Sequence, residues 1–279
     1  GDNSSTVFSG VLQDTSGNLS LTKSGTGTFT LSGANTFAGT TTISAGTVSI
    51  SSEANLGANP GVFNAGQLTL NGGTLNTSAT FAIDDTNRGI TLGASGGTFS
   101  TDVSTSLTIA STNIIAGAGA LTKTGSGNLI LSAANTYTGA TTLSQGTLQL
   151  NANAPSGSAG TLGNASSAVT INDASTGSNN TALLIGTSGV SVGRNIDVVN
   201  FGSGTTTLGG SITSGTGTFT GGITLGKSAT LTADGTSNIT FSTGAISGTG
   251  GITKTGTGTV TLSGANIYSG GTTLSTGTL

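Results

Sequence analysis

Hydrophobic and polar residues alternate along many short stretches of this chain, with a period of two residues. Phe29-Thr30-Leu31, Val48-Ser49-Ile50 and Leu68-Thr69-Leu70 are examples, and Gly or Asn residues separate such stretches. A period of two is typical of a β-strand with one apolar face. Because separate hairpins would leave these faces half exposed, we expect the strands to lie in stacked coils that close a narrow core.

Long segments of the chain also repeat. Residues 21–50 and 121–150 align without a gap, and a third copy, residues 252–279, stops inside the repeat unit. A fixed repeat of this kind predicts a solenoid. We therefore expect residues 1–279 to form a single parallel β-solenoid segment of a longer array, with residues 51–120 and 151–251 as connecting coils. At roughly 20 to 25 residues per coil, this segment has on the order of twelve coils.

Landmarks outside the repeat copies extend the similarity. Leu56-Gly57 recurs as Leu162-Gly163, and Arg88 has a counterpart in Arg194. Six additional residues precede the second set of landmarks, which predicts an insertion in a corner loop around Pro155. From the arginine to the next repeat copy, the second segment is 25 residues longer than the first. An insertion of about one whole coil preserves the stacking, and this length therefore supports a solenoid.

The composition narrows the fold and the chemistry. The chain has 50 Gly, 5% charged residues, and neither Cys nor His. Straight-chain residues that favour helices are scarce and β-branched residues abound, so we expect essentially no helix. Without Cys and His there is no disulfide, no thiolate zinc site, and no side chain of the type that most often binds metals or acts as a general base.

Charge and hydropathy exclude two classes of partner. Six basic residues against nine acidic ones provide no clustered cations for nucleic acid. No apolar run reaches the roughly 18 residues of a membrane span. The first residues, Gly1 to Ser4, lack the basic and apolar regions of a signal peptide, so any export signal would lie outside this fragment.

The three copies share the pattern T-K-x-G-x-G-x-x-x-L-S-x-A-N-x-[FY]-x-G. This pattern resembles the autotransporter-associated β-strand repeat, also called the passenger-associated transport repeat. The resemblance implies a right-handed, single-stranded parallel β-helix in a large secreted or surface-displayed protein of a Gram-negative bacterium. It also implies an outer-membrane translocator as a partner, encoded outside this fragment.

Three sets of residues recur at matching repeat positions. One set follows Ala in each copy, and we interpret its members as turn residues, because Asn tolerates a left-handed backbone and bonds to local backbone groups: Asn35, Asn135 and Asn266. The second set, two residues later, is expected to pack in the corners: Phe37, Tyr137 and Tyr268. The third set is interpreted as solvated lysines that protect exposed sheet edges: Lys23, Lys123 and Lys254.

Asp84 and Asp85, followed by Arg88, form the adjacent acidic pair of the chain. Paired carboxylates can perform glycosidase chemistry, but consecutive strand residues point to opposite faces. We therefore expect no catalytic residue, no bound cofactor and no required metal. Thr-rich runs raise one further hypothesis, a hydroxyl-rich face for ice or a glycan, which would require Thr-x-Thr on the same face of successive coils.

These observations predict a non-enzymatic surface protein whose stalk presents adhesive regions. Its expected partners are glycans or proteins of a host or neighbouring cell, and its expected location is outside the bacterium in association with the outer membrane. A self-assembling extracellular fibre is one alternative, because strand edges without caps can pair with a second copy. A polysaccharide-active β-helix enzyme is another, but the chain has no Trp, two Tyr and scattered acids.

Overall fold

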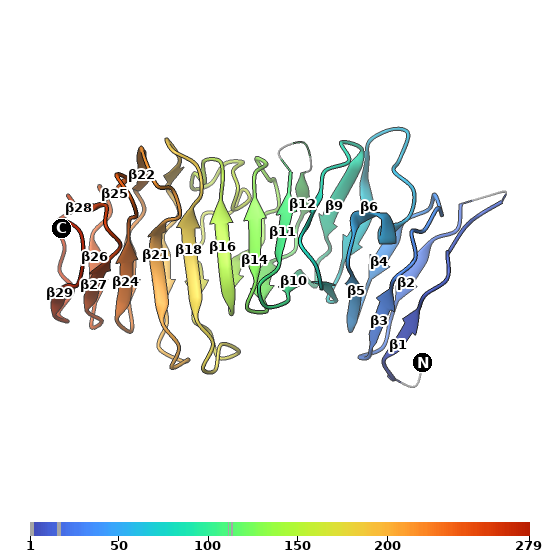
Figure 1. Ribbon diagram of the computed structural model, residues 1–279, viewed down its shortest axis with the longest axis horizontal. Helices are drawn as coiled ribbons and strands as arrows, with labels where there is room; N and C mark the ends of the chain where they lie inside the picture. Colours follow the sequence, from blue (N-terminus) through green and yellow to red (C-terminus); the bar gives the residue numbers. More distant parts are fainter. Residues whose placement is uncertain (1–2, 16–17, 111, 113) are drawn as a thin grey trace. The chain divides into compact units, whose positions relative to one another are not determined.

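The structure is a computed structural model that describes residues 3–15, 18–110, 112 and 114–279. The chain divides into two compact units, residues 1–139 and residues 140–279. Each unit is built from short parallel strands that wind through three sheets (Figure 1).

In the first unit, the largest sheet has six strands in the order β1 (Thr6–Phe8), β3 (Thr28–Leu31), β5 (Thr47–Ile50), β7 (Thr74–Thr77), β10 (Gly97–Thr101) and β13 (Leu121–Thr124). The second sheet comprises β2 (Leu21–Lys23), β4 (Thr41–Ile43), β6 (Asn64–Leu70), β9 (Arg88–Leu92) and β12 (Ile115–Gly117). The third comprises β8 (Phe81–Ile83), β11 (Ser106–Ile109) and β14 (Asn128–Leu131).

In the second unit, one sheet comprises β15 (Thr141–Leu143), β17 (Val169–Ile171), β20 (Ile196–Val198), β23 (Ile223–Leu225) and β26 (Ile246–Gly248). The largest sheet comprises β16 (Gly146–Leu150), β18 (Thr181–Ile185), β21 (Thr206–Gly210), β24 (Ala229–Thr232), β27 (Ile252–Thr255) and β29 (Thr272–Leu274). The third comprises β19 (Ser191–Val192), β22 (Thr216–Phe219), β25 (Asn238–Phe241) and β28 (Thr259–Leu262).

The order of the strands along the chain shows how each turn is made. From β6 onward, consecutive strands of the first unit belong to the three sheets in rotation, and β20 to β25 do the same in the second unit. Strands in register are separated by 19 residues (Thr28 with Thr47) to 35 residues (Gly146 with Thr181). Among the described residues, the largest sheet of each unit has six strands, one per turn. The prediction of an all-β parallel solenoid with about twelve coils is therefore confirmed.

Helix is almost absent, as predicted. In the described part of the chain the helical element is one 3-10 turn, η1 (Glu53–Leu56), whose first turn is capped by the side chain of Ser52. The right-handed sense of the coil stays a prediction of the family resemblance.

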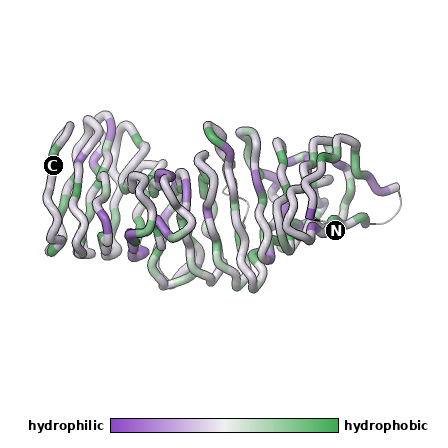
Figure 2. The backbone as a smooth tube through the Cα atoms, turned by 90° about the horizontal axis from the view of Figure 1, so that it is seen from below, coloured by the Kyte–Doolittle hydropathy of each residue, from purple (hydrophilic) through white to green (hydrophobic). Residues whose placement is uncertain are grey.

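The core is thin and lies inside the coil. β10 alternates buried and half-buried residues along its whole length. The inward residues Val48, Leu75 and Phe99 lie in register on successive turns and are fully buried. Figure 2 shows the same pattern along the chain, with hydrophobic segments that recur in successive coils between near-neutral ones. Burial of one such side chain stabilises the fold by about 1.5 to 3 kcal/mol, so stability grows turn by turn.

The repeat copies of the first unit lie on different sheets. From Leu21 the register passes through Thr41, Leu68, Ile90 and Ile115, which is four turns in 94 residues. The second repeat copy begins six residues after Ile115, on the next strand and thus on the next sheet. One repeat period is therefore four turns plus one strand.

Of the two predicted insertions, one forms a complete coil and the other lies in a loop. β9 pairs with β12 one turn later, whereas β20 pairs with β23 and β23 with β26, two turns later. The 25 extra residues thus form one complete coil, as predicted. The six-residue insertion lies outside the strands, because β16 ends at Leu150 and β17 begins at Val169, and residues 156–159 within this loop are exposed.

Glycine permits the close approach of neighbouring turns. A Cβ atom on Gly119 would lie 1.9 Å from the carbonyl oxygen of Gly93, on the preceding turn. Backbone atoms at this distance leave no room for any side chain. Gly61 is exposed, and a Cβ atom there would meet nothing within 4 Å.

We predict that Gly119→Ala lowers the free energy of unfolding by about 2 kcal/mol or more, because two turns must separate to admit the methyl group. Gly61→Ala is the matched control and should change it by less than about 0.5 kcal/mol. Urea unfolding followed by far-UV circular dichroism measures both variants. Equal stability of the two variants would contradict the tight stacking of turns at Gly119.

Candidate functional site

The three repeat lysines are buried, and the interpretation of solvated edge lysines is wrong. Lys123 and Lys254 are fully buried and Lys23 is 9% exposed. Each ammonium group donates hydrogen bonds to the carbonyl oxygens of the next two residues. For Lys123 these are Thr124 and Gly125, at 2.6 and 2.7 Å. In the first and third copies the ammonium group also reaches a carbonyl oxygen on the following turn.

The strand register explains this burial. Lys23 lies in register with Ile43 and Lys123 lies in register with Phe99, so both side chains enter the core. The aliphatic stem packs there, and the charged end turns back to the strand end, where the T-K-x-G-x-G turn leaves carbonyl oxygens without strand partners. The sequence contained this signal, because a lysine two residues after an apolar strand residue shares its face.

Burial changes the acidity of Lys123. Desolvation lowers its pKa from 10.5 to about 7, because the low-dielectric core disfavours the charged form. The pKa of Lys254 is lowered for the same main reason, and the Coulomb attraction of Asp234 opposes the shift. The charged forms of Lys123 and Lys254 are therefore costly to bury, and the hydrogen bonds of each ammonium group offset part of that cost.

The repeat asparagines link successive turns. The side-chain oxygens of Asn35, Asn135 and Asn266 accept backbone N–H groups that lie 20 to 23 residues earlier, at 2.8 to 2.9 Å. None of the three has a positive φ among the described residues. The expected left-handed backbone and local hydrogen bonds are therefore wrong, and these side chains instead replace a ladder hydrogen bond where the strand is interrupted.

The repeat aromatics lie where the solenoid turns its corners. Phe37 and Tyr137 are fully buried. Tyr268, on the last turn of the chain, is half-buried, and its hydroxyl lies 2.7 Å from the hydroxyl of Thr272. The burial of the first two agrees with the predicted corner packing.

The two landmark arginines have equivalent roles. Arg88 and Arg194 are both fully buried, and Nη1 of each donates to the carbonyl oxygen 32 residues earlier, in Leu56 and Leu162. The proposed equivalence of these landmarks is thus confirmed by matching contacts. Arg194 also donates to the carbonyl oxygen of Ser167. Each guanidinium group holds the loop that follows its Leu-Gly landmark.

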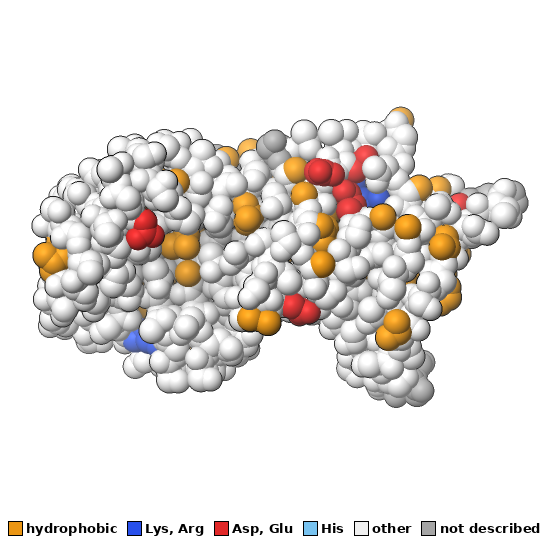
Figure 3. All heavy atoms as spheres, in the orientation of Figure 1, with side chains coloured by type: hydrophobic (Ala, Val, Ile, Leu, Met, Phe, Trp, Pro, Cys, Tyr) orange, Lys and Arg blue, Asp and Glu red, His pale blue; other side chains and the backbone are white. Residues whose placement is uncertain are grey.

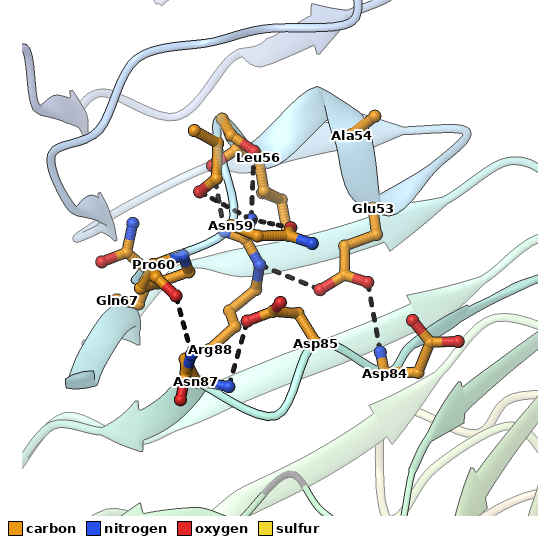
Figure 4. Close-up of polar contacts among 12 residues, drawn as sticks. Glu53, Ala54, Leu56, Asn59, Pro60, Gln67, Asp84, Asp85, Asn87 and Arg88 are labelled. Carbon is orange, nitrogen blue, oxygen red and sulfur yellow. Dashed lines mark hydrogen bonds and ion pairs between the residues drawn. The ribbon is translucent and has the colours of Figure 1, made fainter. Parts of the chain in front are cut away.

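Arg88 has an acidic partner as well (Figure 4). Its Nε lies 2.9 Å from Oε1 of Glu53, and Nη2 donates to the carbonyl oxygens of Gly57 and Ala58 and to Oδ1 of Asn59. Burial raises the pKa of Glu53 above its usual value, although the N–H of Asp84 and the charge of Arg88 oppose the shift. Both oxygens of Glu53 are thus used to fix the loop.

The acidic pair lies in a loop, and the premise that Asp84 and Asp85 are strand residues is wrong. β8 ends at Ile83 and β9 begins at Arg88, so both acids belong to the connection between these strands. Oδ1 of Asp85 accepts the N–H of Asn87, and the N–H of Asp84 donates to Glu53. On the face drawn in Figure 3, acidic atoms lie close to basic ones in one area, and most of the remaining surface is uncharged.

Within the described residues, no group of three or more His, Cys, Asp or Glu side chains could hold a metal ion. In that same part of the chain, no helix has the length and apolar character needed to cross a membrane.

Rows of hydroxyl groups run along the first unit. Five residues in register occupy outward, half-buried positions of β3, β5, β7, β10 and β13: Thr28, Thr47, Thr74, Thr98 and Thr122. A parallel row two residues later consists of Thr30, Ser49, Asn76, Ser100 and Thr124. The required repetition of Thr-x-Thr on one face is therefore partly met. A similar row in the second unit, Thr207, Thr230, Thr253 and Thr273, indicates that Thr is the general outward residue of these strands.

This geometry defines a parallel β-solenoid in which buried cations and amides hold the turns. Three segments, residues 21–50, 121–150 and 252–279, match the model of the passenger-associated-transport-repeat family, which confirms the resemblance predicted from the repeat pattern. The chain is also similar to the adhesin BmaC autotransporter of Brucella suis biovar 1 (strain 1330), with 38% identity over 131 residues. The match covers 47% of this chain and 4% of the length of that relative. No solved structure matches the chain.

We predict that stability rises with pH above pH 7. Because the pKa of Lys123 is lower in the folded chain than in the unfolded chain, the unfolded chain binds more protons between pH 7 and 10.5. The free energy of unfolding should therefore increase by about 1 kcal/mol per pH unit in this window. Lys254, whose pKa is also lowered, adds to this slope, whereas the chain has neither His nor Cys to contribute. In Lys123→Met the slope should fall, and an unchanged slope in urea titrations would contradict the lowered pKa.

We predict that Arg88→Met lowers the free energy of unfolding by about 3 to 5 kcal/mol, because the substitution leaves a half-buried carboxylate and several carbonyl oxygens unpaired. Asp84→Asn is the control and should change it by less than about 0.5 kcal/mol, because the contact of residue 84 is made by its backbone N–H. Denaturant unfolding measures both variants, and similar midpoints would show that Arg88 does not hold this loop.

Proposed function

We propose that this chain is a segment of the passenger of a bacterial autotransporter-like protein, secreted or displayed at the cell surface in association with the outer membrane. The observation that carries this proposal is the presence of three matching passenger-associated transport repeats in a parallel solenoid. The similar protein from Brucella suis, named an adhesin, supports an adhesive context. In this proposal the solenoid is a stalk that holds contact regions at a defined spacing, because each added turn extends it by about 4.8 Å.

We propose further that the segment acts without catalysis. Glu53, the most buried acid of the acidic loop region, has both oxygens engaged in holding structure. Two cavities of the first unit, with volumes of 270 and 90 Å³, are lined by described residues that include no carboxylate. Most glycoside hydrolases that act on polysaccharides place two carboxyl groups across the bound sugar.

The proposal is tested on the bacterium that carries this chain, with antibodies raised against residues 1–279. Intact cells should be labelled, and a brief protease treatment of intact cells should remove the label, because the passenger lies outside. Antibodies against a cytoplasmic protein are the control and should label permeabilised cells alone. Labelling that requires permeabilisation would overturn the surface location, and release of reducing sugar ends from polysaccharides by the purified chain would favour the enzyme alternative.

A further inference from the structure

A projecting loop of the first unit exposes large apolar side chains. The segment between η1 and β6, residues 57–63, extends past the ends of the strands in Figure 1. Val62 is 78% exposed and Phe63 is 54% exposed, and they are adjacent in the sequence. These side chains contribute little to the core, and adjacent large apolar side chains exposed together on one loop form an apolar patch of the kind that protein partners bind.

The base of this loop is fixed in place. The Arg88 guanidinium group binds the carbonyl oxygens of residues 56–58 and the side chain of Asn59. Nδ2 of Asn87 donates to the carbonyl oxygen of Pro60 at 2.8 Å. The loop is thus held by the buried Arg88 and the half-buried Asn87 up to Pro60, close to its tip, as Figure 4 shows. A loop fixed before binding loses less conformational entropy when it binds.

The second unit provides an internal comparison. Arg194 holds the corresponding loop, residues 163–168, through the carbonyl oxygens of Leu162 and Ser167. That loop has the sequence GNASSA and contains no side chain larger than Asn. The arginine contact therefore does not require a large apolar tip, and the Val62-Phe63 pair needs an explanation of its own.

The charged residues around the loop limit the class of partner that it can bind. All basic residues of the first unit are buried, namely Lys23, Arg88 and Lys123. Beside the loop lie Asp84, which is exposed, and the half-buried Asp85 and Glu53. A second copy of this unit would offer the same acidic surface without exposed cations, and an anionic membrane would repel it. Charge complementarity instead favours a basic protein surface.

We propose that loop 57–63 is a docking element for a protein partner that has an apolar pocket bordered by Lys and Arg residues. Val62 and Phe63 enter the pocket, and Asp84 and Asp85 pair with the basic border. This inference deepens the proposed adhesive function, because it names the contact residues and the class of partner. It predicts that binding weakens as salt increases, because Asp84 is exposed and Asp85 is partly accessible to solvent.

The test uses a phage-displayed library of random peptides as the probe, selected on the purified chain. We expect the enriched peptides to combine apolar residues with Lys or Arg. Their dissociation constants should rise at least tenfold on Val62→Ser/Phe63→Ser, and more modestly on Asp84→Asn/Asp85→Asn, which should also lose the salt dependence. Phe201→Ser is the matched control, because Phe201 is an exposed aromatic of the other unit (72% exposed), and it should change nothing.

Several results would overturn the proposal. Failure to enrich any peptide, enrichment of acidic peptides, or equal binding to the wild type and to Val62→Ser/Phe63→Ser each excludes a basic protein partner at this loop. Wild-type binding to phosphatidylcholine vesicles that is lost in the same variant would assign the tip to lipid instead. Circular dichroism should show unchanged folding of the variants, because Val62, Phe63, Asp84 and Phe201 are exposed and the amide oxygen of Asn at position 85 can still accept the N–H of Asn87. Surface labelling of cells is independent of all these results, so failure of the docking element would leave the proposed function intact.

Discussion

The hydrogen bonds between successive turns are the interaction on which this structure depends. A short strand has no partner within its own turn, so its N–H and C=O groups are satisfied by the turns before and after it. The register of one turn therefore determines which residues of the next point inward. Side chains at matching positions consequently form continuous rows, apolar inside the coil and rich in hydroxyl groups outside it. Glycine at positions such as Gly119 lets the corners of the coil approach as closely as the strands do.

The corners create a problem that the strands do not have, because backbone N–H and carbonyl groups there lose their strand partners. This chain solves it with the few long polar side chains that it possesses. Lys123 donates to a carbonyl oxygen of its own turn, and the side chain of Asn135 accepts an N–H of the preceding turn. Arg88 donates to a carbonyl oxygen of a loop more than thirty residues away. Five of the six basic residues are fully or almost fully buried in this way. The acidic surface is thus a consequence of how the cations are used inside.

Much of this architecture was predictable because it follows from periodicity. Strand alternation, the repeat copies and the extra coil after Arg194 follow from the spacing of residues along the chain, which can be read directly from the sequence. The errors concerned individual polar residues. The charge of Lys23 predicts a solvated side chain, although its position two residues after Leu21 places it on the inward face. The sequence around Asp84 predicts a strand, but β8 ends one residue earlier. The exposed pair at Val62 and Phe63 was not predicted, because no spacing rule shows which way a loop points.

The displacement of the repeat by one strand has a geometric consequence for valency. The copies that begin at Leu21 and Leu121 lie on different sheets of the first unit, so equivalent surfaces of these copies face different directions around the coil axis. A rigid partner that recognises one copy cannot use the same approach to engage the next, and avidity from the two copies would need a flexible or wrapped partner. The two copies thus present equivalent surfaces on two different sides of the coil, rather than as a row of identical sites along one face.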